Sequence, residues 1–188
     1  VTLYTSDGAA IEKRLKSKTN TDVVWNQAGK ARYCFAPDPD GNAIEIVELP
    51  AGAEPALLQR AAIGLTVGDV EKSRAFYGKL LGLAEQPTQD LPNGGTKYSY
   101  MAGPTVIKFW QAPANAPKKT GGPQEAIGFR YFTFMVKDAD AAQKWLTEAG
   151  AKIVMPPTDF GRLARILFIA DPDGNFIEFA APPKPAAK

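Results

Sequence analysis

The chain of 188 residues contains no histidine and a single cysteine, Cys34. Without histidine it can supply no Ser-His or Cys-His nucleophile, no imidazole base and no imidazole metal ligand. One cysteine excludes an internal disulfide and a cysteine-based zinc site. Any metal would therefore be held by carboxylates, amides or tyrosine, and we expect the Cys34 thiol to be buried and unreactive.

A strong net charge and long apolar runs are also lacking. The 22 basic and 20 acidic residues leave a formal net charge of +2, which is too small to recruit nucleic acid or a membrane surface. No apolar run approaches the ~18 residues of a membrane span, and no signal peptide is predicted. The scarcity of cysteine fits the cytoplasm, taken as the default, and the periplasm alike.

The sequence does contain a repeat. The pentapeptide Asp-Pro-Asp-Gly-Asn occupies residues 38–42 and 171–175, and a glutamate follows seven residues after its first aspartate in both copies, at Glu45 and Glu178. Each repeat begins with a stretch in which apolar residues alternate with others. The stretch ends at an aspartate, and a helical pattern follows. Three such beginnings precede Asp7, Asp69 and Asp138. We call the three segments the first, middle and last repeats.

Each repeat is predicted to have the order βαβββ. Period-two alternation predicts the opening strand, and the aspartate is a good helix N-cap. Three strands follow the helix, in the last repeat at about 151–155, 164–170 and 175–180. The pentapeptide joins the last two strands, because proline presets φ and glycine accepts positive φ. The first helix is expected to be the shorter one, with Ile11 and Leu15 as its apolar residues.

Tandem βαβββ repeats that end in Asp-Pro-Asp-Gly-Asn-x-Ile-Glu resemble the vicinal oxygen chelate superfamily of glyoxalase I, bleomycin-resistance proteins and extradiol dioxygenases. Residues 63–83 resemble its opening strand and helix, and the resemblance covers 1–50 and 60–182. It implies an α+β fold in which βαβββ units pair edge to edge into half-open β-sheet cups, with helices outside and the site on the concave face. It does not select one activity, because the superfamily spans several.

The domain organisation follows from this resemblance. We expect residues 60–182 to form one two-repeat cup with a linker at 112–126, preceded by a linker at 51–59 and followed by a flexible tail at 183–188. Residues 1–50 would be the second half of another cup, completed by an upstream unit of the same chain or by a homodimer. Val1 opens inside a strand-like run without a methionine, which indicates a processed chain or a fragment.

Strand alternation assigns side chains to the concave face of the 60–182 cup. The expected ligand-binding residues are Thr66, Lys108, Trp110, Tyr131, Thr133, Met135, Phe176 and Glu178. In the superfamily, the metal is held by residues seven before each opening aspartate, usually histidine, and by closing-strand carboxylates or amides. In this chain Ala62 and Tyr131 stand seven residues before the opening aspartates of their repeats, and Lys108 aligns with a closing-strand ligand. We therefore expect no cofactor in 60–182 and an ion pair between Lys108 and Glu178.

Three functions stay open. The first is a metal-free binding protein for a small, partly aromatic or anionic molecule. The second is a metal-dependent lyase or dioxygenase whose active cup uses residues 1–50 and an upstream unit, with Glu45 as a ligand of a divalent metal. The third is a structural or oligomerising module. The lack of histidine favours the first or third for this chain alone, so the sequence argues against an enzyme. The expected partners are a small molecule and a homodimer or upstream unit, without nucleic acid or membrane.

Overall fold

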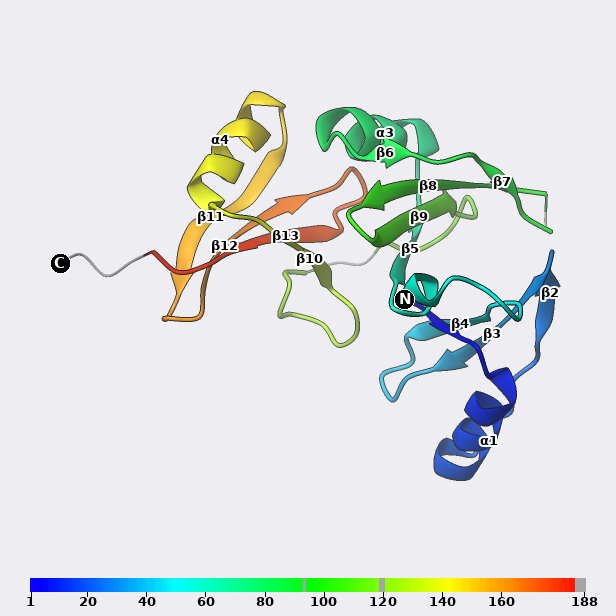
Figure 1. Cartoon of the computed structure of the whole chain (residues 1–188). Helices are drawn as coiled ribbons and strands as arrows, with labels where there is room; N and C mark the ends of the chain where they lie inside the picture. Colours follow the sequence, from blue (N-terminus) through cyan, green and yellow to red (C-terminus); the bar gives the residue numbers. More distant parts are fainter. Residues whose placement is uncertain (93, 119–120, 185–188) are drawn as a thin grey trace. The chain divides into compact units, whose positions relative to one another are not determined.

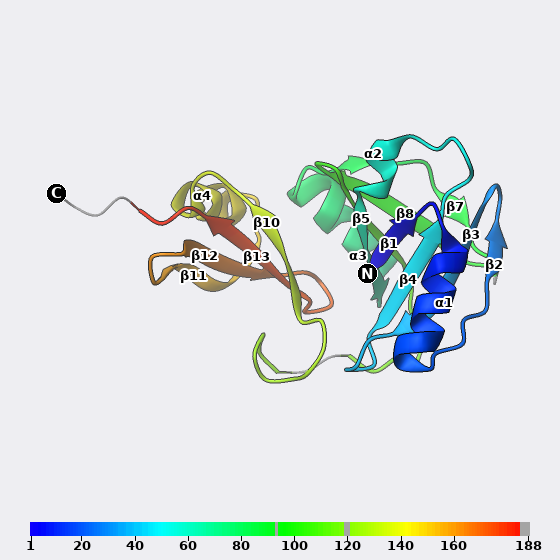
Figure 2. The same cartoon turned by 60° about the horizontal axis from the view of Figure 1, so that its bottom comes forward.

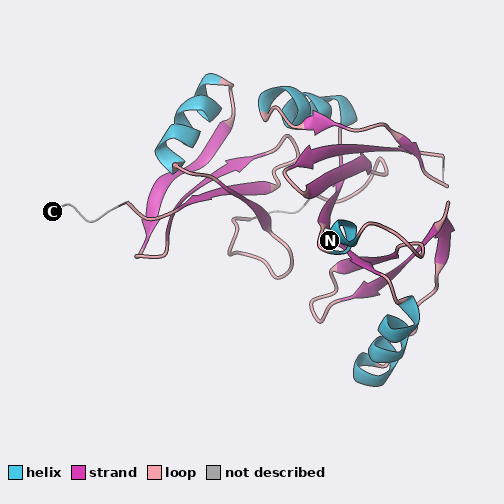
Figure 3. Cartoon of the chain, viewed as in Figure 1, coloured by secondary structure: helices cyan, strands magenta, loops and turns pink. Residues whose placement is uncertain are grey.

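The computed structural model describes residues 1–92, 94–118 and 121–184, and its first and last repeats follow the predicted βαβββ order, whereas the middle repeat has one strand more after its helical segment (Figures 1 and 3). The first repeat consists of β1 (Thr2–Thr5), α1 (Gly8–Thr19), β2 (Asn26–Ala28), β3 (Ala31–Pro37) and β4 (Ala43–Glu48). The middle repeat consists of β5 (Ala61–Val67), α3 (Val70–Arg74), η1 (Ala75–Leu80), β6 (Ala84–Glu85), β7 (Gln89–Asp90), β8 (Thr96–Ala102) and β9 (Thr105–Gln111). The last repeat consists of β10 (Tyr131–Met135), α4 (Ala139–Glu148), β11 (Lys152–Phe160), β12 (Ala164–Ala170) and β13 (Phe176–Ala181). The α+β class is confirmed.

The chain divides into two compact lobes. The N-lobe comprises Val1–Leu65 and Glu85–Phe109, and the C-lobe comprises Thr66–Ala84 and the chain from Trp110 onward. The C-lobe thus contains the helical segment of the middle repeat as well as the whole last repeat.

The N-lobe is built on a sheet that the first and middle repeats share. Its strand order is β2-β3-β4-β1-β5-β9-β8-β6, with β7 beside β8. β1 runs parallel to β4 and antiparallel to β5, where Thr2 faces Ala62 (Figure 2). We expected the middle repeat to pair with the last one instead. The short connection between β4 and β5, which contains α2 (Pro55–Leu58), keeps the two consecutive repeats adjacent.

One face of the N-lobe sheet is apolar and buried. Cys34, Ile46, Ile107 and Phe109 alternate with residues of the opposite face, and each is buried, as predicted for Cys34. Helix α1 begins after Asp7, whose carboxylate accepts a hydrogen bond from the Ala10 N–H at 2.9 Å.

The length of α1 contradicts the expectation of a short first helix. α1 has 12 residues and α4 has ten. The apolar face of α1 is sparse, yet Lys16 and Lys18 lie in its last turn, where positive charge stabilises a helix end.

The C-lobe sheet has the order β10-β13-β12-β11. β10 runs parallel to β13, so that Tyr131 faces Phe176 and Thr133 faces Glu178. Helix α4 packs on β11, β12 and β13, with Leu146 fully buried (Figure 1). Within the described part of the chain, β10 has a strand neighbour on one side only.

The Asp-Pro-Asp-Gly-Asn turn of the last repeat also anchors the helical segment of the middle repeat. Asp171 accepts hydrogen bonds from the backbone N–H groups of Asp173 and Asn175 and from the Asn175 side chain. Asp38 makes the same three bonds in the first repeat. In the C-lobe, the hydroxyl of Tyr77 on η1 donates a further bond to Asp171 at 2.9 Å. The hydrogen bonds of the turn therefore account structurally for Asp38 and Asp171.

Three of the predicted connecting segments can be compared with the structure. The predicted linker 51–59 contains α2, and residues 119–120 of the linker 112–126 lie outside the described residues. Of the predicted tail, 185–188 also lie outside them, whereas Lys184 pairs with Asp140 at 2.9 Å. Among the described residues, no helix is both long enough and apolar enough to span a bilayer.

Candidate functional site

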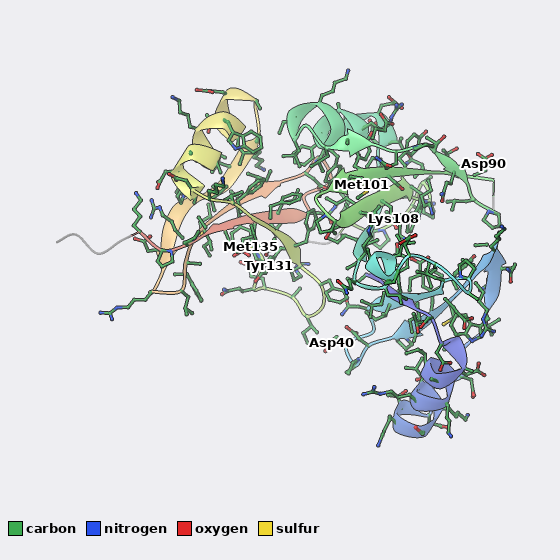
Figure 4. All side chains as sticks on the ribbon, in the orientation of Figure 1. Asp40, Asp90, Met101, Lys108, Tyr131 and Met135 are labelled. Carbon is green, nitrogen blue, oxygen red and sulfur yellow. The ribbon has the colours of Figure 1, made fainter. Side chains whose placement is uncertain are left out.

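An ion pair between a buried lysine and a half-buried glutamate lies on the N-lobe face opposite the apolar one. The Lys108 ammonium on β9 contacts Oε2 of Glu45 on β4, and Figure 4 labels Lys108 on its strand. Lys108 is 8% exposed. The Thr2 hydroxyl on β1 donates a hydrogen bond to the same carboxylate oxygen at 2.5 Å. Two repeats therefore supply one cation, one carboxylate and one hydroxyl to a single cluster.

The local sequence places these three side chains on one face. Thr2 stands directly opposite Glu45 in the parallel β1–β4 pair and opposite Ala62 in the antiparallel β1–β5 pair. Neighbouring residues on adjacent strands share a face of the sheet. The turn at 38–42 fixes the register of β4 and so determines that Glu45 points to this face while Ile46 enters the core.

The surroundings change the acidity of several groups in this cluster. Burial raises the pKa of Glu45, whereas the Lys108 ammonium and the hydrogen bonds from Lys108 and Thr2 lower it. The lowering effects outweigh burial, so the pKa of Glu45 lies below its ordinary value. Burial and the Glu45 carboxylate raise the pKa of Tyr4. Burial and repulsion by Lys108 lower the pKa of Lys97. The cluster is therefore an environment in which charges interact strongly.

The predicted ion pair between Lys108 and Glu178 is wrong. The partner of Lys108 is Glu45, because the middle repeat shares its sheet with the first repeat. Glu178 accepts a hydrogen bond from the Thr133 hydroxyl at 2.5 Å within the C-lobe. This bond repeats the one between Thr2 and Glu45, since both threonines precede their opening aspartate by five residues.

The C-lobe brings together five of the predicted site residues. Tyr131, Thr133 and Met135 share one face of β10, and Phe176 and Glu178 continue that face on β13. Tyr131 is 47% exposed and Met135 is 79% exposed, and Figure 4 shows both on β10.

The last two predicted residues lie elsewhere. Thr66 and Trp110 lie near the ends of β5 and β9, where these strands pass from the N-lobe into the C-lobe, and Thr66 is exposed. A role for either residue in ligand binding stays a prediction.

The N-lobe cluster does not suit a divalent metal. Ala62, at the position seven before the opening aspartate, has no donor atom, and Lys108 neutralises Glu45. Divalent cations require several oxygen, nitrogen or sulfur ligands. Throughout the described residues, no group of three or more His, Cys, Asp or Glu side chains could hold a metal ion. The role of Glu45 as a ligand of a divalent metal, expected only if an upstream unit completes the site, stays a prediction.

Three residues of this cluster, Thr2, Tyr4 and Lys97, were not predicted from the sequence. Thr2 could have been found, because it occupies the same position in the first repeat that Thr133 occupies in the last. Tyr4 and Lys97 carry no comparable signal. Their relevance depends on the strands that the tertiary structure places beside them.

Comparison with known proteins gives a consistent result. Residues 59–179 match the model of the Glyoxalase/Bleomycin resistance protein/Dioxygenase superfamily. The chain is 30% identical over 186 residues to a lactoylglutathione lyase of Oryza sativa subsp. japonica, covering 92% of this chain and 61% of the rice protein. It therefore spans less than two thirds of that relative.

Two solved structures show the same fold. The crystal structure of glyoxalase I from Zea mays superposes with a TM-score of 0.74 at 22% identity, covering 96% of this chain and 66% of the maize chain. A glyoxalase/dioxygenase from Nostoc punctiforme superposes with a TM-score of 0.54 at 23% identity, covering 73% of this chain and 100% of the other.

Proposed function

The chain belongs to the Glyoxalase/Bleomycin resistance protein/Dioxygenase superfamily, and we propose that its N-lobe binds a small molecule without a metal. The proposal depends on one observation: the half-buried carboxylate of Glu45 is already paired with the Lys108 ammonium. An ammonium contributes one positive charge and offers no open coordination position. A ligand on this face would therefore be held by charge, hydrogen bonds and apolar contacts rather than by chelation.

Metal analysis of the full chain tests this proposal. The protein is purified without chelators and its content of zinc, nickel, manganese and iron is measured. We expect far less than one ion per chain. Stoichiometric metal that disappears in Glu45→Gln would overturn the proposal, with Glu125→Gln, a change in the segment between β9 and β10, as the matched control.

A ligand screen supplies the second measurement. Amide chemical shifts are recorded while small molecules are added to the full chain. We expect saturable shifts on β4 and β9, the strands of Glu45 and Lys108. Shifts confined to other strands across the entire screen would contradict binding on this face.

A second candidate is supported by the C-lobe. Thr133 and Glu178 repeat the geometry of Thr2 and Glu45, but among the described residues Glu178 has no lysine or arginine paired with it. The free side of β10 leaves room for a further βαβββ unit or a second copy of the chain. The metal-dependent lyase or dioxygenase hypothesis therefore moves from Glu45 to Glu178, because β1 already has a strand on each side.

An activity assay distinguishes this candidate. Lyase activity on lactoylglutathione, the compound in the name of the rice relative, is measured with added divalent metals. The candidate predicts activity for the chain extended to the length of that relative and loss of activity in Glu178→Gln. Activity that survives Glu178→Gln, but not Glu45→Gln, would exclude the C-lobe as the active site.

A further inference from the structure

Lys97 lies on the same face of the N-lobe sheet as the Lys108–Glu45 pair. Ser99 on β8 stands directly opposite Lys108 on β9, and Lys97 is two residues before Ser99 on the same strand. Such diagonal neighbours have Cα atoms about 7–8 Å apart. Lys97 is half-buried. Two lysine side chains therefore emerge beside each other from adjacent strands.

The charges on this face are not balanced. The same oxygen of Glu45 accepts from both Lys108 and Thr2. Within the described ranges, Lys97 has no ion pair and no side-chain hydrogen bond, and its charge acts on Glu45, the carboxylate that Lys108 already contacts. Lys97 and Lys108 thus share a single carboxylate, that of Glu45. An excess of positive charge remains beside Lys97.

A half-buried ammonium without a counter-ion is unfavourable. Burial removes water from the Lys97 ammonium, and the charge of Lys108 repels it. The lowered pKa of Lys97 has these two causes, partly offset by Glu45. A bound anion would supply the missing charge. Ser99, beside Lys97 and opposite Lys108, adds a hydroxyl that can donate a hydrogen bond to an oxyanion.

We propose that Lys97 is the anion-binding residue of this face and that the ligand is a small molecule carrying a carboxylate or phosphate group. The inference deepens the proposed function, because it names the chemical class of the ligand. Lys108 is committed to Glu45, so that the charge available to a ligand is that of Lys97. Anion binding at Lys97 also requires no change in the Lys108–Glu45 pair.

The test uses the full chain and two probes. Sodium benzoate and methyl phosphate are titrated separately at constant ionic strength, and binding is followed by amide chemical shifts. We expect saturable binding of at least one probe, and the stronger one identifies the carboxylate or the phosphate as the preferred group. Lys97→Met should weaken binding at least tenfold, whereas Lys97→Arg should retain it.

A matched control separates binding from folding. Lys30 is exposed between β2 and β3, and Lys30→Met removes the same charge without affecting this face. Lys97→Met should keep or raise the unfolding midpoint, because it removes an uncompensated half-buried charge. Equal affinity of wild type and Lys97→Met, or the absence of saturable binding by both probes, would overturn the inference.

The result of the anion titration can be distinguished from the test of metal-free binding. Metal content is measured on the same sample. Stoichiometric metal at Glu45 refutes metal-free binding irrespective of the anion titration. Loss of anion binding, while uncharged molecules from the screen still shift β4 and β9, refutes only the role of Lys97.

Discussion

Lys108 and Glu45 stand 63 residues apart in the chain and form a partly buried ion pair between two repeats that share one sheet. The pair neutralises the carboxylate that would otherwise be the most evident metal ligand of the N-lobe. It also makes the first and middle repeats energetically dependent on each other. Both consequences can be measured.

Breaking the pair from one side should destabilise the protein more than removing both charges. Lys108→Met leaves the half-buried Glu45 carboxylate without its cation. Breaking a fully buried pair costs about 3–5 kcal/mol, and we expect a smaller loss here because Glu45 keeps some contact with water. Lys108→Met with Glu45→Gln removes that unpaired charge and should recover most of the loss. Urea unfolding of the wild type, both single variants and the double variant gives the four free energies. A double variant that is less stable than Lys108→Met would contradict the pairing.

The stabilisation by Glu45 should depend on pH with a defined sign. Its pKa is lower in the folded protein than the ordinary value of 4.5, so its contribution is present above that value and is lost as the pH falls through the folded pKa. The difference in unfolding free energy between wild type and Glu45→Gln should therefore shrink as the pH falls below 4.5 and on through the folded pKa. Comparing the two proteins cancels the titration of the other carboxylates. A difference that grows on acidification would refute the assignment.

Removal of the Tyr77 hydroxyl should destabilise the C-lobe. Tyr77 is fully buried and its hydroxyl donates to Asp171, and burial together with this carboxylate raises the pKa of Tyr77. Tyr77→Phe should lower the unfolding free energy by about 1–3 kcal/mol. Tyr33→Phe, on the half-buried β3 tyrosine, is the control and should cost much less. Equal effects of the two changes would show that the Asp171 bond is energetically unimportant.

Cys34 should react with thiol reagents only when the protein unfolds. Its side chain is fully buried, and burial raises the pKa of its thiol. The thiolate is the reactive form, so labelling of the native chain should be far slower than labelling in urea. The measurement is the rate of colour development with a disulfide reagent across a urea series. Rapid labelling without urea would contradict the buried position of β3.

Much of the local structure was predictable because it depends on short-range rules. The alternation before Asp138 correctly separates Tyr131, Thr133 and Met135, which are exposed on one face of β10, from the residues that face the helix. Asp7, Asp69 and Asp138 cap their helices as predicted. The two pentapeptide turns also form as predicted, because their hydrogen bonds lie within five residues.

The pairing of the repeats could not be read in the same way. Alternation specifies the face to which a side chain points, but backbone hydrogen bonds at a strand edge are the same for any partner strand. The three opening strands have similar patterns, so nothing in them selects β1 rather than β10 as the neighbour of β5. Because β5 pairs with β1, the partner of Lys108 is Glu45 rather than Glu178.

The sequence by itself determined the βαβββ repeats, their caps and turns, the inward position of Lys108 and the lack of histidine ligands, because each depends on residue type or on neighbours within a few positions. Tertiary structure alone decided that Glu45, rather than Glu178, meets Lys108, that Lys97 stands beside this pair, and that Tyr77 reaches Asp171. These relationships join residues from different repeats. They arise from the pairing of strand edges and the packing of helices, which the pattern of any one segment does not specify.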